Sequence, residues 1–286
     1  MPRRSRPSVG LRGILGSVAA PPPFPSLPAL VGAILLLACV FASGACLAGP
    51  PFFTDDPVPV ELGHWETNNY ASGTVAKGAF AGVSPGVDAN YGALANVQLH
   101  LLVPLALTQS NGANAQWGPG DVEIGAKYRF VAADEKDWWP QVAFYPFLDF
   151  PTGNAARGLG TGSTHLFLPI WLQKDFGKWS TYGGGGYWLN PGPGNRNFWY
   201  AGWVVQYQAT ATLSLGGEIF HQTSFSTGGP GSVGFPFGSR DATGFNFGGI
   251  YDLNKTYHLL FSFGRGLENA PASNLFSYYL ALRVTY

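Results

Sequence analysis

The feature that most constrains this chain is a two-residue alternation of apolar and polar side chains, repeated in many short segments after residue 62. In segment 121–130, one face is apolar throughout, whereas the other includes glutamate, glycine, lysine and arginine. Segments 212–222 and 275–286 show the same pattern. Period-two alternation is typical of a β-strand with two different faces, and no segment after residue 62 sustains helical periodicity. The sequence therefore predicts an all-β protein.

The alternation predicts twelve strands, most of them close to the 9–11 residues that a tilted membrane strand needs. Their expected bounds are 64–75, 85–93, 96–108, 121–132, 140–150, 165–176, 179–189, 198–209, 212–224, 243–252, 257–266 and 275–286. Short turns are expected after the even-numbered strands. Longer loops rich in glycine, proline and asparagine are expected after the odd-numbered ones, the longest at 225–242. Bacterial outer-membrane barrels have this alternation of connections, with the short turns in the periplasm.

The distribution of charge indicates that the outer face of the strands contacts membrane lipid. Charged residues make up 11% of the chain and aromatic residues 15%, against about 25% charged residues in soluble domains. A charge on the lipid face costs about 2–4 kcal/mol at the bilayer midplane, so the charges of the strands should face inward. A soluble β-sandwich or lipocalin-like barrel would alternate too, but with its charges outside. We therefore predict a transmembrane, antiparallel, up-and-down β-barrel of about twelve strands.

Polar side chains of inward parity are the candidates for lining the lumen. They are Glu66, Asp88, His100, Glu123, Lys127, Arg129, Asp149, Glu218, His258 and Arg283. Aromatic residues adjoin both the short turns and the long loops, as the two girdles of such a barrel require. Pro104, Pro146 and Pro169 fall inside expected strands, where they remove a backbone donor. We expect β-bulges at these three positions.

The N-terminal region reads as an export signal. Arg3, Arg4, Arg6 and Arg12 precede an apolar run at 30–48, which ends with the small residues Cys46 and Ala48. This layout predicts a signal peptide at 1–48, cleaved after Ala48, and hence a location in the bacterial outer membrane. A permanent anchor is the alternative, because the run is nearly long enough to span a bilayer. A twin-arginine signal and lipidation at a cysteine fit the neighbouring residues less well.

After the signal, a periplasmic or lumenal segment is expected at 49–62, and the barrel at 63–286. Residues 51–57 read PFFTDDP and residues 61–66 read ELGHWE. This opening resembles the bacterial outer-membrane family labelled MetA-pathway of phenol degradation. The resemblance covers essentially the whole mature chain and implies a transporter-like or channel-like barrel for aromatic or hydrophobic compounds. Members of that family often end in phenylalanine, whereas this chain ends in Tyr286, which leaves recognition by the barrel-insertion machinery plausible.

The adjacent acids Asp55 and Asp56 have two interpretations. The segment could fold into the lumen as a plug and pair with Lys127, Arg129 or Arg283, because buried acids without cationic partners are costly. It could equally be a solvated periplasmic cap.

The predicted function is passive passage of small solutes, with outer-membrane lipids and those solutes as partners. Basic and acidic residues number sixteen each, so nucleic acid is not expected. No catalytic residue, metal or cofactor is expected either, since the five histidines are dispersed. The alternatives are a non-conducting structural or surface-binding barrel, or an outer-membrane lipid hydrolase. The first would be sealed by Tyr145, Phe147, Phe220 and Tyr279, and the second would use His221 with Ser224 or Ser226.

Overall fold

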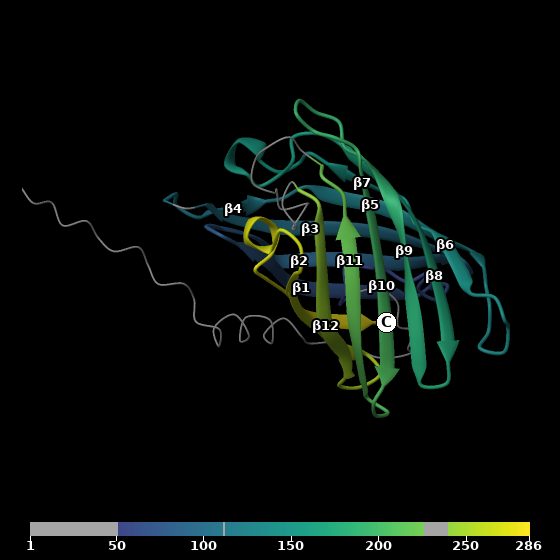
Figure 1. Ribbon diagram of the computed structural model, residues 1–286. Helices are drawn as coiled ribbons and strands as arrows, with labels where there is room; N and C mark the ends of the chain where they lie inside the picture. The colour runs from purple at the N-terminus through teal and green to yellow at the C-terminus, as the bar shows by residue number, and fades with distance from the viewer. Residues whose placement is uncertain (1–50, 111, 226–239) are drawn as a thin grey trace, which may run out of the picture. The chain divides into compact units, whose positions relative to one another are not determined.

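The computed structural model describes residues 51–110, 112–225 and 240–286, which form a closed antiparallel β-barrel (Figure 1). The predicted signal peptide, most of the longest loop and Ser226 lie outside these ranges. The ring closes where β1 pairs with β14, from Glu66 opposite Thr285 to Val75 opposite Phe276. Among the described residues, no helix has the length and apolar character needed to cross a bilayer.

The described residues form fourteen strands at twelve positions in the wall, because two positions are each shared by two consecutive strands. The strands are β1 (Trp65–Ala76), β2 (Ala79–Leu94), β3 (Val97–Ser110), β4 (Gln116–Pro119), β5 (Val122–Val131), β6 (Gln141–Phe144), β7 (Phe147–Phe150), β8 (His165–Phe176), β9 (Trp179–Leu189), β10 (Phe198–Gln208), β11 (Leu213–Gln222), β12 (Ala242–Asp252), β13 (Tyr257–Gly266) and β14 (Phe276–Thr285). Both β4 and β5 pair with β3, and both β6 and β7 lie between β5 and β8. The predicted strand number is therefore confirmed.

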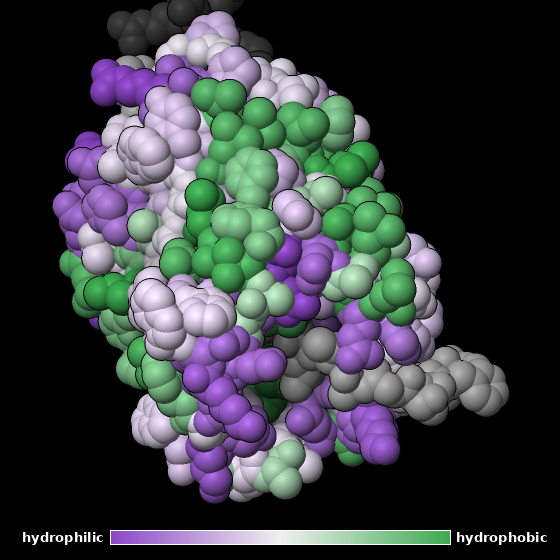
Figure 2. Space-filling model, turned by 90° about the vertical axis from the view of Figure 1, so that its right-hand side faces the viewer, coloured by the Kyte–Doolittle hydropathy of each residue, from purple (hydrophilic) through white to green (hydrophobic). Residues whose placement is uncertain are grey.

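The two faces of the wall differ as the alternation requires. On β3, Leu99, Leu101 and Val103 are exposed on the outside, whereas the intervening Gln98 and His100 are buried. Figure 2 shows apolar side chains over much of one outer face, with hydrophilic ones gathered toward its lower end. A lipid-facing sheet needs this arrangement, because hydrocarbon solvates apolar groups only.

Aromatic residues surround both ends of the barrel. The turn end carries the short connections 95–96, 132–140, 177–178, 209–212 and 253–256. The loop end carries the other connections between neighbouring wall positions, whereas 120–121 and 145–146 are breaks within the wall. Trp138 and Trp179 are exposed beside the turn end, and Trp117 and Trp199 are exposed beside the loop end. These are the positions that membrane-interface girdles occupy.

The connection after β1 differs from the prediction. We expected a longer loop there and a second strand beginning at residue 85. Instead a two-residue turn, Lys77–Gly78, joins β1 directly to β2 at Ala79, and Gly78 adopts a positive φ of 78°. A register shift between Val83 and Gly86 lets the strand continue past Pro85. The proline therefore marks a bulge within the strand and not its beginning.

Three prolines inside the expected strands interrupt the backbone hydrogen bonds of the sheet. They do so either at a register shift or at a break between two short strands. Pro104 pairs with Gly86, at the edge of the shifted register in β2. Pro146 separates β6 from β7. Pro169 keeps its register with β9 but faces the gap between β6 and β7, where its carbonyl accepts a hydrogen bond from the Tyr145 amide at 3.2 Å. The sheet therefore tolerates its missing donors at local breaks on neighbouring strands.

Candidate functional site

Residues 51–62, here called the N-terminal segment, cross the lumen before β1 begins. The segment starts against β13, where the Ser262 hydroxyl donates to the Pro51 carbonyl at 2.6 Å. Phe52 then packs against Tyr182 of β9 and Val204 of β10. Phe53 meets the ring of Phe220 edge-on, with 5.4 Å between ring centroids. The first residues of the segment are therefore anchored on apolar and polar groups from several wall strands.

Thr54 is the most closely fitted residue of the segment. Its amide donates to Glu218 Oε1 at 2.7 Å, and the Phe53 amide donates to Oε2 at 3.3 Å. The Asn246 side chain donates to the same carboxylate at 2.6 Å. A β-carbon at Gly202 on β10 would collide with the Thr54 hydroxyl, so glycine is required there for the segment to approach the wall. Glu218, a predicted lumen residue, thus holds the segment's backbone.

The two acids of the segment face Lys127 on β5. Lys127 Nζ lies 3.0 Å from Asp55 Oδ1 and 3.9 Å from Asp56 Oδ1, and the lysine is only 1% exposed. Of the three cations considered from the sequence, Lys127 is thus the one whose contacts reach Asp55. Arg129 bonds instead to Asn96 and Gln141 near the turn end.

The segment leaves the lumen along β2 and β3. The Val60 amide donates to Gln98 Oε1 at 2.9 Å, and the Gly63 amide donates to the Gly92 carbonyl at 2.7 Å. A β-carbon at Gly92 would collide with the Glu61 carbonyl, so the chain passes directly over the wall here. From this point it turns into β1.

Next to the segment, charged and amide side chains form one connected network on β1, β2, β3, β5 and β14. Arg283 lies 3.3 Å from Glu66 and donates to Asn68 at 2.9 Å, and Asn68 in turn donates to Asp88 at 3.0 Å. His100 closes the chain, with Nδ1 3.1 Å from Asp88 and Nε2 2.8 Å from Glu123. The period-two parity brings these predicted residues together.

The remaining predicted residues lie elsewhere in the interior. Asp149 on β7 sits directly across from Glu123 on β5. His258 lies at the turn end, 2.7 Å from Asp252 and 3.4 Å from Thr285. Sequence reasoning missed the amides that connect the charges. Asn68, Asn90 and Gln98 share the inward parity of their charged neighbours, and that parity could have identified them.

A buried group of aromatic residues fills the opposite side of the lumen. This group, the aromatic cluster, comprises Tyr145, Phe167, Trp171, Trp188, Phe198, Tyr200, Phe220 and Phe225, with Ala242. Phe167 stacks on Trp188 with 4.6 Å between centroids, and Trp188 stacks on Phe198 at 5.7 Å. Two of the residues expected to seal a non-conducting barrel, Tyr145 and Phe220, belong to this cluster. Phe147 packs against it, and Tyr279 lies beside a separate group around Tyr70.

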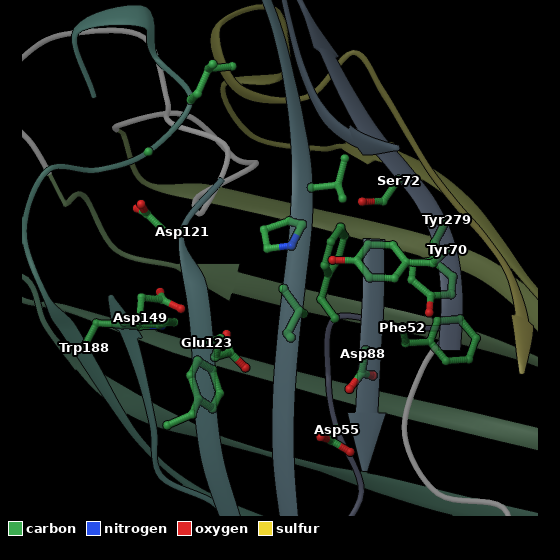
Figure 3. Close-up of a pocket in the computed structure, with 17 residues that line it drawn as sticks. Phe52, Asp55, Tyr70, Ser72, Asp88, Asp121, Glu123, Asp149, Trp188 and Tyr279 are labelled. Atoms are coloured by element: carbon green, nitrogen blue, oxygen red, sulfur yellow. The ribbon is translucent and has the colours of Figure 1, made fainter. Parts of the chain in front are cut away.

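Two adjoining cavities remain between the network and the aromatic cluster. The larger one, here called the acidic cavity, has a volume of about 350 Å³, and the smaller one about 100 Å³. They share Asp55, Asp88, Glu123 and Phe147 in their walls. In Figure 3 the carboxylates of Glu123 and Asp149 lie beside each other, and the rings of Tyr70 and Tyr279 stand across the cavity from them. The interior is thus hollow beside the N-terminal segment.

The part of the chain that the structure describes contains no group of three or more His, Cys, Asp or Glu side chains arranged to hold a metal. On the rim, His221 Nδ1 lies 2.8 Å from the Thr243 hydroxyl, which donates to Glu268 at 2.9 Å. Because the threonine proton is committed to Glu268, Nδ1 must be the donor in its contact with Thr243.

Comparison with known proteins agrees with this architecture. The family model for the MetA-pathway of phenol degradation matches residues 68–284. The chain belongs to this family. A search of curated proteins finds no match. Among solved structures, an outer membrane channel from Pseudomonas putida F1 has a TM-score of 0.64 at 17% identity, covering 81% of this chain and 98% of that one. The NanC porin has a TM-score of 0.50 at 10% identity, covering 78% and 98%. This member of the MetA-pathway family therefore has the fold of outer-membrane channels and porins.

Proposed function

We propose that this protein is an outer-membrane channel through which small solutes diffuse, and that the N-terminal segment forms its constriction. One observation carries the proposal: the segment crosses the lumen on specific wall contacts, yet leaves two adjoining cavities beside it. The outward apolar face and the family's fold support a location in the outer membrane, reached through the predicted signal peptide.

The contacts of the segment suggest how passage would be controlled. Selectivity in a pore of this kind depends on the width of the constriction and on the charges around it. Asp55 lines both cavities and is held by Lys127, so this ion pair stands where the two spaces meet. Weakening the pair would widen the constriction without altering the wall. Diffusion needs no covalent step, and no enzymatic activity is part of the proposal.

A sealed barrel is the main rival, and the placement of the bulky inward residues favours the channel over it. Tyr145 and Phe220 lie in the aromatic cluster on one side of the lumen. Phe147 and Tyr279 form part of the wall of the acidic cavity. The aromatic cluster therefore narrows the interior from one side, while Phe147 and Tyr279 border a space that stays hollow.

The lipid-hydrolase alternative would require a serine hydroxyl activated by His221. The structure gives His221 the contacts of a rim residue, since its Nδ1 is engaged with Thr243 and its side chain is 47% exposed. These contacts lie at the loop end, and neither His221 nor Thr243 lines the two cavities described above. They favour a structural role at the rim.

Conductance in planar bilayers tests the proposal. The refolded chain should give discrete steps, and Asp55→Asn with Asp56→Asn should increase their size, because the segment loses its hold on Lys127. The control is Asp134→Asn with Asp137→Asn, which removes the same charge from the 132–140 turn and should leave the steps unchanged. Absence of steps in every form would overturn the channel. Equal steps in all forms would show that the segment is only a cap.

A further inference from the structure

The acidic cavity combines two kinds of surface. Aromatic rings of Phe52, Tyr70, Phe147, Trp188 and Tyr279 form apolar walls, while five carboxylates also face it. None of the described residues that line it is a lysine, an arginine or a histidine. A space of about 350 Å³ lies at the lower end of the range for small-molecule sites, which are mostly apolar with a few polar groups.

The five carboxylates differ in how fully they are satisfied. Asp55 pairs with Lys127, and Asp88 accepts from Asn68 and Asn90 and faces His100. Asp121 accepts from the backbone and side chain of Thr161 and from the Gly153 amide, and it fastens the loop between β7 and β8. These three acids therefore have structural partners.

Asp149 has no such partner. It is 8% exposed, and no N–H group of the described residues donates to it. The directly opposite positions on the two neighbouring strands are Glu123 on β5 and the buried His165 on β8. The ion pairs of the described residues join neither of them to Asp149, and of the two only Glu123 lines the acidic cavity with it. Two adjacent carboxylates in a buried site either share a proton, so that one is neutral, or both stay charged with a cation between them. His100 approaches Glu123 from the other side, through Nε2 at 2.8 Å, and leaves the Asp149 side open to the cavity.

The rings next to this pair favour an organic cation over an inorganic one. Phe147 lies on the same strand and face as Asp149, and Trp188 meets Phe147 edge-to-face at 5.4 Å. In Figure 3 Trp188 stands beside Asp149, with Glu123 next to it. Two phenylalanine rings of the aromatic cluster stack on Trp188, so Trp188 offers apolar contact along its edge. Aromatic rings bury apolar groups, and an open ring face also attracts a cation through its quadrupole. A hydrated metal ion would use only the acids, whereas an arylalkyl ammonium ion would use both surfaces.

We propose that the acidic cavity binds small arylalkyl amines in their ammonium form. The ammonium group would lie between Glu123 and Asp149, and the apolar body against Phe147 and Trp188. As a statement about which solutes the pore admits, this inference rests on the proposed channel function. As a statement about binding, it can be tested separately.

The experiment is calorimetric titration of the refolded chain in detergent with three probes of similar shape and different charge. They are 2-phenylethylammonium, 2-phenylethanol and 3-phenylpropionate. The ammonium probe should bind at least about ten-fold more tightly than the alcohol, which is about 1.4 kcal/mol, and the carboxylate should not bind. Equal binding of the alcohol, or tighter binding of the carboxylate, would overturn the proposal.

Two variants locate the binding. Glu123→Gln with Asp149→Asn should weaken binding of the ammonium probe at least about ten-fold, whereas Asp134→Asn with Asp137→Asn should not change it. If the first variant does not fold, the comparison of the three probes on the unmodified chain still tests the proposal. Unchanged binding in a folded first variant would overturn the site. Binding without conductance steps would overturn the channel function but support the binding site. Conductance steps without binding would support the channel function and overturn the binding site.

Discussion

The two sides of the lumen differ in what fills them. On the side of β8–β12, aromatic rings pack against one another. On the side of β1, β2, β3, β5 and β14, charged groups and amides are linked by hydrogen bonds, and the cavities adjoin them. Apolar rings gain by filling space, whereas buried charges must keep defined partners at defined distances. The aromatic side is therefore suited to supporting the barrel, and the charged side to contacting solutes.

The largest effect on stability is expected on the charged side of the lumen. Lys127→Met removes the buried cation that Asp55 and Asp56 face, which should lower the free energy of unfolding by about 3–5 kcal/mol. Urea unfolding in phospholipid vesicles measures this. Adding Asp55→Asn and Asp56→Asn to the same chain should recover most of the loss. A single variant as stable as the parent chain would show that the pair does not contribute.

The aromatic side should respond in stability but not in conductance. Phe198→Ala removes a ring that stacks on Trp188 and contacts Phe225, and it should cost about 3 kcal/mol in the same unfolding assay. The size of the conductance steps should stay within the scatter of the parent chain. A large change in conductance with little change in stability would reverse the roles assigned to the two sides.

A smaller effect on stability is expected where the N-terminal segment connects the two sides of the lumen. Gly202→Val places a side chain where Thr54 now lies, and so it should detach Thr54 from Glu218. Loss of these hydrogen bonds from a buried carboxylate should cost about 1–3 kcal/mol and increase conductance. Ala201→Val, on the exposed outer face of the same strand, is the matched control. Equal behaviour of the two variants would contradict a docked segment.

The smallest effect is expected at the rim. His221→Gln changes an exposed residue that contacts Thr243, so stability should change by less than about 0.5 kcal/mol and conductance should not change. Hydrolysis of a phospholipid substrate by the parent chain, lost in this variant, would instead support the enzyme alternative.

Much of the barrel wall could be predicted because the period-two pattern depends only on residues that are close in sequence. Period two places Glu123 and Lys127 on the inner face whatever their partners are, and the hydrocarbon outside requires the same parity along each strand. The turn at Lys77–Gly78 was missed for a local reason as well. We expected a loop between 75 and 85, whereas β2 already begins at Ala79 and takes up Pro85 in a register shift between Val83 and Gly86.

The contacts of the site could not be predicted to the same degree, because they join distant parts of the chain. Asp55 and Lys127 are 72 residues apart, and Arg129 and Arg283 offered the same charge on the same parity. The choice among them depends on where the N-terminal segment crosses the lumen. That path depends on the close contacts of Thr54 with Gly202 and of Glu61 with Gly92. The period-two pattern of the sequence does not indicate these contacts.

The long reach of the N-terminal segment has a consequence for the order of assembly. Its hydrogen bonds join residues 38, 72, 164 and 211 positions apart, to β3, β5, β11 and β13. Contacts of such wide separation form only after the intervening chain has been brought together. The docking site does not exist until the strands have closed into a ring. The part of the barrel that is synthesised first is therefore the part that reaches its place last.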